Sequence, residues 1–309
     1  MKRPSNLKGD ILGGVTASIV SLPLAIAFGV AAFAPLGPGF VAQGALAGLY
    51  ASIISGAVAS LFGGTPAQIS GPTAPMSVVV TSVIVNLMQD PELAAIGAEP
   101  AQVILLMVSV TILFGGLFQV VLGKVGGGKL IKYIPYPVVS GFMNGIAVLI
   151  LLSQLRPLLG VGKAVGLAAI FTGGAALKWE TLLIGGVTFL ATLAGERFIR
   201  AVPGALTGLV CGVGAYFALG SLGSPGLLAL EGNQLIIGPI PSAVPTPRQL
   251  FTFFAVAGQI PLAKWGLLIV PAFTLGVLAA IDTLLTSVVA DVVTKTKHNS
   301  NKELFGQGL

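Results

Sequence analysis

Long apolar stretches separated by short polar connections run through the chain, and their length predicts helices that cross a membrane. A helix needs about 20 apolar residues to span the hydrocarbon core of a bilayer, whereas an outer-membrane barrel shows short segments of alternating polarity. The pattern therefore predicts an all-α polytopic membrane protein. About eight transmembrane segments are expected: Ile11–Ala34, Val41–Phe62, Thr73–Leu87, Val103–Leu122, Val138–Leu155, Thr181–Ala194, Ala205–Leu219 and Trp265–Ala290.

The composition supports the same class. Of the 309 residues, 55% are hydrophobic and 8% are charged, whereas soluble domains carry about 25% charged residues. The net charge of +6 does not indicate nucleic acid, because the basic residues stand in short clusters between apolar stretches. Cys211 is the single cysteine and His298 the single histidine, which excludes a disulfide within the chain and argues against a Cys/His metal site. We expect His298 to lie at the surface.

The distribution of positive charge predicts the orientation in the lipid bilayer. Lys and Arg gather in the cytoplasmic loops of membrane proteins. With the N-terminus inside, eleven of the sixteen Lys and Arg residues fall in inner segments and five in outer ones. The connection that contains Asp90, Glu92 and Glu99 then lies outside. We therefore expect a plasma (inner) membrane protein with both ends of the chain in the cytoplasm.

One stretch, Gly63–Met76, interrupts the apolar pattern without carrying a charge. Irregular backbone at membrane depth is tolerated where protein or a watery cavity surrounds it. Pro72 and Pro75 suit the first turn of a helix, so the short third segment is predicted to begin near Thr73. The N-terminus of such a helix attracts an anion through its free N–H groups and its dipole. An ordinary tight turn between two membrane helices explains the same residues equally well.

Asp282 is the acidic residue that stands well inside an apolar segment. A carboxylate at that depth costs at least about 2.5 kcal/mol on insertion scales, which makes it a candidate functional residue. Thr286 follows four residues later and therefore lies on the same helix face. A carboxylate and a hydroxyl suit a hard cation such as Na⁺, with backbone carbonyls as further ligands. Two alternatives stay open: a protonated Asp282 that carries H⁺, or a structural acid.

Several of these stretches resemble one family of transporters. Gly63–Pro66 and Ser70–Met76 resemble the third-helix motif of SulP-type anion transporters, and Pro137–Gly145 resembles their fifth helix. Ile281–Asp291 and Ser300–Leu309 look especially like the sodium-dependent bicarbonate transporters of cyanobacteria within that family. The resemblance covers the whole chain.

The resemblance implies a fold of two inverted seven-helix repeats divided into a core and a gate. It implies core helices within residues 10–123 and 264–290, gate helices within 134–220 and an outer crossover at 221–250. The second repeat and the STAS domain of the family are not present in residues 1–309. The resemblance also allows a homodimer formed through the C-terminal region that these residues lack.

The same resemblance implies the ligands of the site. A small anion such as bicarbonate would bind at the start of the third helix, and Na⁺, the coupling ion, would bind at Asp282 and Thr286. The residues that would face the anion are Thr73, Ala74, Gly71 and Pro72.

Together these observations predict a secondary active transporter that carries bicarbonate with Na⁺ by alternating access. The alternatives are an H⁺-coupled carrier or exchanger of sulfate or another anion, and a membrane scaffold that transports nothing. A scaffold has no need of Asp282 or of the polar break before Thr73. An enzyme is not expected, because the sequence displays no Ser/His/Asp set, metal cluster or phosphate-binding loop.

Overall fold

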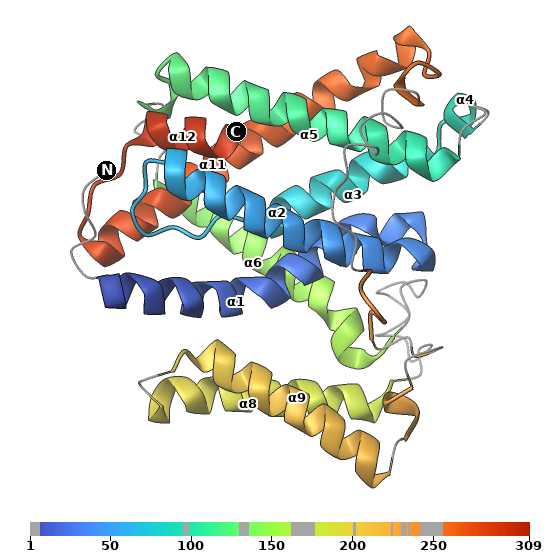
Figure 1. Cartoon of the computed structure of the whole chain (residues 1–309), viewed down its shortest axis with the longest axis vertical. Helices are drawn as coiled ribbons and strands as arrows, with labels where there is room; N and C mark the ends of the chain where they lie inside the picture. Colours follow the sequence, from blue (N-terminus) through green and yellow to red (C-terminus); the bar gives the residue numbers. More distant parts are fainter. Residues whose placement is uncertain are drawn as a thin grey trace. The chain divides into compact units, whose positions relative to one another are not determined.

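The structure, a computed structural model, is built from α-helices joined by short 3₁₀ turns (Figure 1). It describes residues 7–94, 99–129, 136–161, 177–199, 202–223, 225–229, 233, 236–241 and 256–309, and these residues contain no strand. Most of the predicted outer crossover, 221–250, lies outside the described residues. The helices are α1 (Leu7–Phe33), α2 (Val41–Phe62), α3 (Ala74–Met88), α4 (Pro91–Ala94), α5 (Pro100–Lys124), α6 (Tyr136–Leu159), α8 (Trp179–Phe198), α9 (Gly204–Leu222), α11 (Ile269–Thr294) and α12 (Ser300–Gly308). The 3₁₀ turns are η1 (Ala34–Leu36), η2 (Pro38–Phe40), η4 (Pro225–Leu227) and η5 (Leu262–Leu268).

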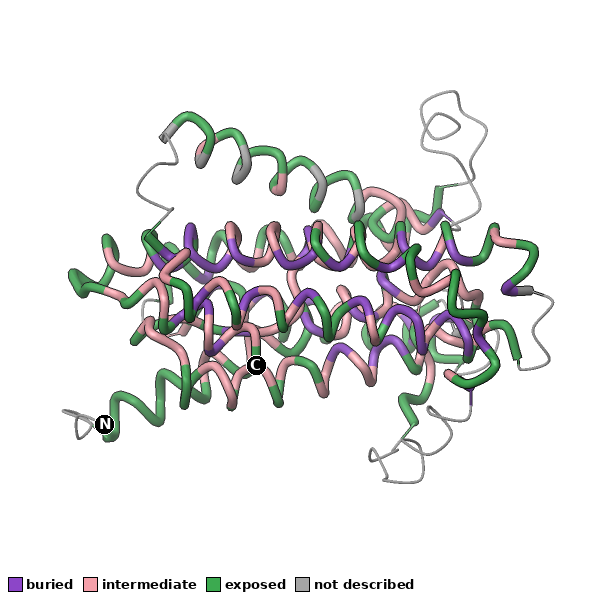
Figure 2. Tube along the Cα trace, turned by 90° about the horizontal axis from the view of Figure 1, so that it is seen from above, coloured by how far each residue is buried: buried purple, intermediate pink, exposed green. Residues whose placement is uncertain are grey.

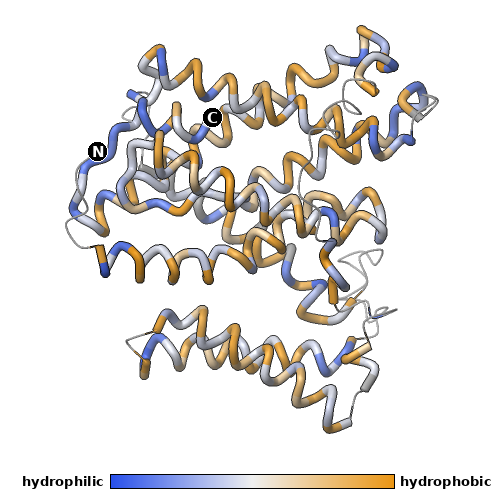
Figure 3. The backbone as a smooth tube through the Cα atoms, viewed as in Figure 1, coloured by the Kyte–Doolittle hydropathy of each residue, from blue (hydrophilic) through white to orange (hydrophobic). Residues whose placement is uncertain are grey.

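Each predicted transmembrane segment overlaps one of these helices. By length and composition, 6 helical spans among the described residues can cross a membrane, and α3 and the Asn144–Leu159 part of α6 are shorter apolar helices. The long helices are mainly hydrophobic, and hydrophilic residues gather at the ends of some helices and in the connections, as expected of segments that traverse lipid (Figure 3). The chain is therefore an all-α, multi-pass membrane protein.

The contacts divide the chain into two compact units, which are described separately. One unit comprises residues 1–23 and 144–239, and the other comprises 24–143 and 240–309. In the first, α8 and α9 pack closely because glycines of α9 meet threonines of α8. A Cβ at Gly208 or Gly212 would collide with Thr192 or Thr188. The core-and-gate division stays a prediction.

The second unit holds the main apolar core, where α3, α5 and η5 meet. Ile84, Val103, Met107 and Leu268 are at most 2% exposed. In α3, α5 and α11 buried positions recur among exposed ones, as along several helices in Figure 2, so these helices turn one side inward and present another that is available to lipid. This core fixes the position of α3, which carries the predicted anion site at its first turn.

A stripe of small residues along α2 forms a close helix contact. Gly44 and Gly48 lie against Ala25 and Gly29 of α1, so near that an added Cβ at either glycine would strike backbone. Further along α2, Ser52 and Gly56 face the loop that follows the helix. Small residues let backbones approach in a membrane, where apolar side chains gain little by leaving lipid.

The short helix α12 packs against α5, α2 and α11. Asn299 is its N-cap, because the side-chain oxygen accepts the backbone amide of Lys302 at 3.1 Å. The next turn is held by Asn301, whose Oδ1 accepts the Gly128 amide at 2.9 Å, and the Lys124 ammonium lies over the Phe305 ring. These contacts place the chain that follows α11 against the ends of α2 and α5.

Candidate anion and cation site

The third helix begins where the prolines predict. α2 ends at Phe62, and α3 starts at Ala74 with Thr73 as its extended N-cap residue and Pro75 in the first turn. The first backbone hydrogen bond of this helix runs from the Ser77 amide to the Thr73 carbonyl at 3.0 Å. By helix geometry the amides of Ala74 and Met76 have no acceptor within α3. The start of this helix therefore presents two N–H groups and a positive dipole end.

The N-terminus of α3 meets the middle of α11. The Thr73 hydroxyl is shielded from solvent and makes no hydrogen bond of normal geometry, yet it lies close enough to the Asp282 carboxyl to interact with it. Asp282 lies midway along α11, so α3 starts at the depth of the middle of a spanning helix. This arrangement favours a discontinuous third helix over an ordinary turn at the membrane surface.

The other predicted cation ligand, Thr286, lies one turn along α11. Its side chain is exposed, and its hydroxyl donates to the Asp282 carbonyl at 2.8 Å. That bond uses the hydroxyl hydrogen and leaves the oxygen lone pairs free to coordinate a cation. Among the described residues there is no group of three His, Cys, Asp or Glu side chains that could hold a metal ion. A cation at Asp282 would therefore depend on hydroxyl and carbonyl oxygens, which are ligands that hard cations accept.

The remaining predicted anion ligands surround the same point. Ala74 is buried, and Gly71 and Pro72 are half-buried in the loop. Gly71 lies against Ser52 of α2, and an added Cβ there would come within 3.2 Å of the Ser52 hydroxyl. All of these residues lie near the first turn of α3, and their roles as ligands stay predictions.

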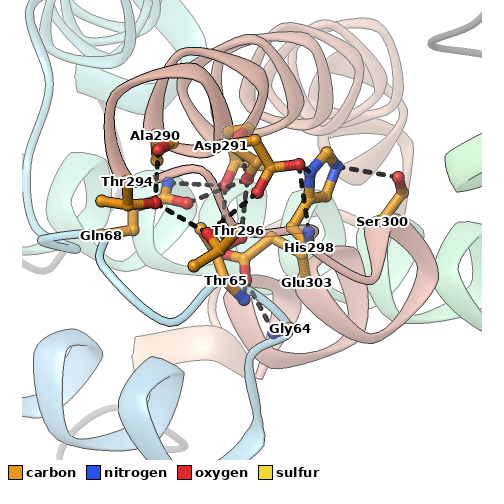
Figure 4. A network of polar contacts seen from close by, with 12 residues as sticks. Gly64, Thr65, Gln68, Ala290, Asp291, Thr294, Thr296, His298, Ser300 and Glu303 are labelled. Atoms are coloured by element: carbon orange, nitrogen blue, oxygen red, sulfur yellow. Dashed lines mark hydrogen bonds and ion pairs between the residues drawn. The ribbon is translucent and has the colours of Figure 1, made fainter.

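Glu303 of α12 is a neighbour of this site that the sequence pattern did not indicate, and its residue is only 2% exposed beside the loop. Its Oε2 accepts the backbone amides of Gly64 at 2.7 Å and Thr65 at 2.8 Å (Figure 4). Its Oε1 accepts the Gln307 side-chain amide at 2.9 Å and faces the Thr283 hydroxyl at 3.5 Å. Glu303 stands in a polar segment after the last apolar stretch, where an acidic residue is expected to be solvated. The glycines at 63, 64 and 306 were the available signal, because they allow this close contact.

In the linker between α11 and α12, two predictions are wrong: the surface position of His298 and the absence of a Ser/His/Asp set. The His298 side chain is 8% exposed and is not a surface histidine, since its Nδ1 lies 2.7 Å from Asp291 Oδ2. Its Nε2 lies 2.9 Å from the Ser300 hydroxyl, so a Ser–His–Asp chain is present after all (Figure 4). Asp291 also accepts the His298 backbone amide at 3.1 Å and faces the Thr296 hydroxyl at 3.4 Å. These extra bonds indicate that Asp291 organises the turn between the helices.

The opposite end of α3 is joined to η5 by an ion pair. Lys264 Nζ lies 2.7 Å from Asp90 Oδ2 and 3.0 Å from Glu92 Oε2. The hydrogen bond from Lys264 holds the pKa of Asp90 below its ordinary value. Hence α3 is attached to the segment that leads into α11 at one end, and it meets Asp282 of α11 at the other.

Comparison with known proteins identifies the family. The model of the "Sulfate permease family" matches residues 7–309. The bicarbonate transporter BicA of Picosynechococcus sp. is 37% identical over 98% of this chain and 49% of its own length. A putative sulfate transporter of Bacillus subtilis, YvdB, is 28% identical over 97% of this chain and 51% of its own length. The chain thus spans about half the length of the curated relatives it matches.

Two solved structures share the fold. The transmembrane domain of a cyanobacterial bicarbonate transporter, BicA, aligns with a TM-score of 0.72 at 37% identity, covering 98% of this chain and 70% of that chain. SLC26A9 aligns with a TM-score of 0.68 at 20% identity over 100% of this chain and 47% of that chain, which supports the fold alone. The relatives are named as transporters and not as enzymes. Because the family model matches residues 7–309 of this chain, the resemblance to SulP-type transporters is confirmed: this chain belongs to the sulfate permease family.

Proposed function

We propose that this chain forms the ion-binding part of a transporter that carries bicarbonate together with Na⁺. The observation that supports the proposal is the approach of Thr73 to Asp282. A helix N-terminus suited to an anion and a carboxylate suited to a cation meet within one unit of the chain. Two opposite ions that bind side by side stabilise each other, which is what a symporter requires.

In this proposal, the binding of Na⁺ and of the anion is coupled by electrostatic interactions with Asp282. In the absence of Na⁺, the Asp282 carboxylate repels an anion at the first turn of α3. Two unit charges about 4 Å apart interact by about 4 kcal/mol at an effective dielectric constant of 20. When Na⁺ binds to Asp282, with Thr286 and backbone carbonyls as further ligands, its charge cancels that of the carboxylate and removes this repulsion. By linkage, bicarbonate then raises the affinity for Na⁺ by the same factor.

The anion would be held mainly by backbone. The amides of Ala74 and Met76 and the Thr73 hydroxyl supply donors, while the loop at Gly71 and Pro72 supplies close backbone approach. Bicarbonate is small and singly charged, so a helix dipole and one cation can balance its charge. Transport would follow by alternating access, in which one group of helices moves against another around a fixed site. Self-association stays a prediction.

A second candidate is an H⁺-coupled carrier of sulfate or a related anion. Two relatives of Bacillus subtilis, named putative sulfate transporters, cover at least 97% of this chain. Protonation of Asp282 would remove the same repulsion that Na⁺ removes. Sulfate is divalent and would need more compensating charge than the start of α3 supplies, so bicarbonate is the preferred substrate.

Uptake by the full-length protein in membrane vesicles tests both candidates. We expect radiolabelled bicarbonate to enter faster under an inward Na⁺ gradient, and sulfate to compete poorly. The test should include a proton gradient without Na⁺. Sulfate uptake driven equally well by protons would replace the Na⁺–bicarbonate assignment with the second candidate.

A further inference from the structure

Glu303 and its partners join three parts of the chain that are far apart in sequence. The carboxylate on α12 binds the loop through the amides of Gly64 and Thr65, at 2.7 and 2.8 Å, and binds Gln307 at 2.9 Å on its own helix. These three partners can only donate to it. The geometry therefore fits the ionised carboxylate, held by charge-assisted hydrogen bonds.

Gln68 extends the network from the loop to α11. Its amide nitrogen donates to the Thr283 hydroxyl at 3.1 Å, and its oxygen accepts from the Ser287 hydroxyl at 2.9 Å. The Thr65 hydroxyl also lies 2.8 Å from the Ser287 hydroxyl. Thr283 is the residue next to Asp282, so the loop that leads to Thr73 is attached to the turn of α11 that carries the carboxylate.

The backbone segments around Glu303 are too closely packed to approach one another further. An added Cβ at Gly64 would strike the Asn299 carbonyl, and one at Gly306 would strike the backbone of Gly63. The Asn299 amide also donates to the Gly64 carbonyl at 3.0 Å. Because α12 and the loop already touch through backbone, loss of the carboxylate cannot be repaired by a closer approach of the two segments.

We infer that Glu303 is a positioning residue, which sets the loop so that the first turn of α3 faces Asp282. This inference rests on the proposed function for its transport readout. Site residues on separate segments must be held within a fraction of an ångström, and misplacement by about 1 Å can cost 10²-fold in activity. Loss of Glu303 would leave the Gly64 and Thr65 amides buried without their acceptor, so the loop would move to find other partners.

The first test replaces Glu303 by glutamine and then exchanges the two partners. In Glu303→Gln the negative charge is lost, and the new NH2 group takes the place of the oxygen that accepts from Gln307, whose amide must turn over to present its own oxygen. Adding Gln307→Glu restores the pairing, with the carboxylate now at position 307, where the Ser70 hydroxyl, 2.5 Å from the Gln307 nitrogen, can donate to it. Outer partners of an ion site are worth roughly 10- to 100-fold in affinity. We expect Glu303→Gln to raise the half-saturating Na⁺ and the bicarbonate KM together by about 10-fold, and the exchanged pair to recover most of both.

The matched control is Glu99→Gln. Glu99 also accepts a glutamine side chain, Gln102 at 2.9 Å, but it is exposed and far from the loop in sequence. The Glu99→Gln variant should transport like the parent, with all rates corrected for the amount of protein in the membrane. Parental kinetics in Glu303→Gln would overturn the inference. So would failure of the exchanged pair to recover affinity in a protein that reaches the membrane.

A second measurement does not depend on transport. Cysteines introduced as Thr73→Cys and Asp282→Cys in a Cys211→Ser background should form a disulfide on mild oxidation. We expect the reaction to be fast with Glu303, slow with Glu303→Gln and fast again with the exchanged pair. Equal rates in all three would overturn the inference. An absence of Na⁺-stimulated uptake in the parent would contradict the proposed function and leave the crosslinking result to decide the role of Glu303.

Discussion

Glu303 Oε2 accepts the backbone amide of Gly64 at 2.7 Å, although the two residues are 239 positions apart in sequence. The bond fastens α12 to the loop that precedes α3, and the same loop is fastened through Gln68 to α11. The two helices that carry the predicted anion and cation sites are therefore parts of one hydrogen-bonded structure. A substitution at one predicted site should consequently change ion binding at the other.

Removal of the Asp282 carboxylate should abolish the Na⁺ dependence of uptake. Asp282→Ala deletes the charged ligand, so bicarbonate uptake should no longer respond to Na⁺ while the protein still inserts. Thr286→Ala removes a neutral ligand and should raise the half-saturating Na⁺ concentration several-fold. The measurement is initial uptake against Na⁺ concentration for each variant in the full-length protein.

Thr294→Ala is the matched control for the threonine. Thr294 also lies on α11 and donates to the carbonyl one turn earlier, Ala290, at 2.7 Å, just as Thr286 donates to Asp282. Its replacement should leave the Na⁺ dependence unchanged. Full Na⁺-stimulated uptake by Asp282→Ala would remove Asp282 from the cation site.

Substitution at Thr73 should affect the anion according to charge. Thr73→Ala removes one donor and leaves the backbone amides, so the bicarbonate KM should rise several-fold. Thr73→Asp places a fixed negative charge at the positive end of α3 and should reduce uptake far more. Thr73→Lys adds a bulky side chain, but its positive charge should not repel the anion. Initial uptake against bicarbonate concentration measures all three.

Two controls separate charge from shape at this position. Thr73→Asn has nearly the shape of the aspartate without its charge and should resemble Thr73→Ala. Ser82→Ala removes an exposed hydroxyl further along α3, where it donates to Val78 at 3.0 Å, and should have no effect. Uptake by Thr73→Asp at the parental level would mean that the anion binds elsewhere.

The predicted orientation can be tested by labelling from outside the cell. Glu92→Cys and Lys297→Cys each replace an exposed residue, in a Cys211→Ser background. We expect an impermeant thiol reagent to label position 92 on intact cells, and position 297 only after the membrane is opened. Labelling of position 297 but not 92 on intact cells would reverse the orientation.

The ion pair between Asp90 and Lys264 predicts a dependence of stability on pH. Lys264 lowers the pKa of Asp90 from its ordinary value of 3.8. A carboxyl with a lowered pKa in the folded state stabilises the fold above its unfolded pKa and loses that contribution as pH falls through the folded pKa. Asp90→Asn should therefore melt at a lower temperature than the parent in detergent at about pH 5 to 7, and the gap should close below about pH 4.

Glu99→Gln serves as the comparison for this ion pair. Glu99 is an exposed acidic residue that accepts a neutral partner, Gln102. Its replacement should leave the melting temperature unchanged across the same pH range. A gap between Asp90→Asn and the parent that persists undiminished in acid would show that the aspartate acts through something other than its charge.

Close packing of α1 on α2 predicts opposite effects of one substitution at two glycines. In Gly48→Ala the new Cβ would strike the Ala25 carbonyl, and overpacking of this kind costs about 1–3 kcal/mol. In Gly56→Ala the nearest atom would be the Ser70 carbonyl oxygen at 3.6 Å, which is ordinary contact. Thermal melting should show Gly48→Ala destabilised and Gly56→Ala unchanged or improved, because alanine favours a helix. Equal melting temperatures would contradict the packing.

The membrane class, the approximate helices and the start of α3 could be predicted from the amino-acid sequence. These features are local, because a bilayer selects for apolar segments of sufficient length and the prolines before Met76 restrict where a helix can begin. Asp282 was also recognisable, since an acid within an apolar stretch stands out against its neighbours. No knowledge of contacts was needed for any of these predictions.

The partners of the polar groups became visible from the way in which the helices pack. Glu303 and His298 belong to a polar segment that reads as solvated, and both are buried because the chain after α11 turns back onto the ends of α2 and α5. Gln68 reaches Ser287, a residue 219 positions away. A buried polar group requires a hydrogen-bond partner. Which group becomes that partner depends on how the helices and loops pack, and the hydrophobic periodicity of the sequence does not predict it.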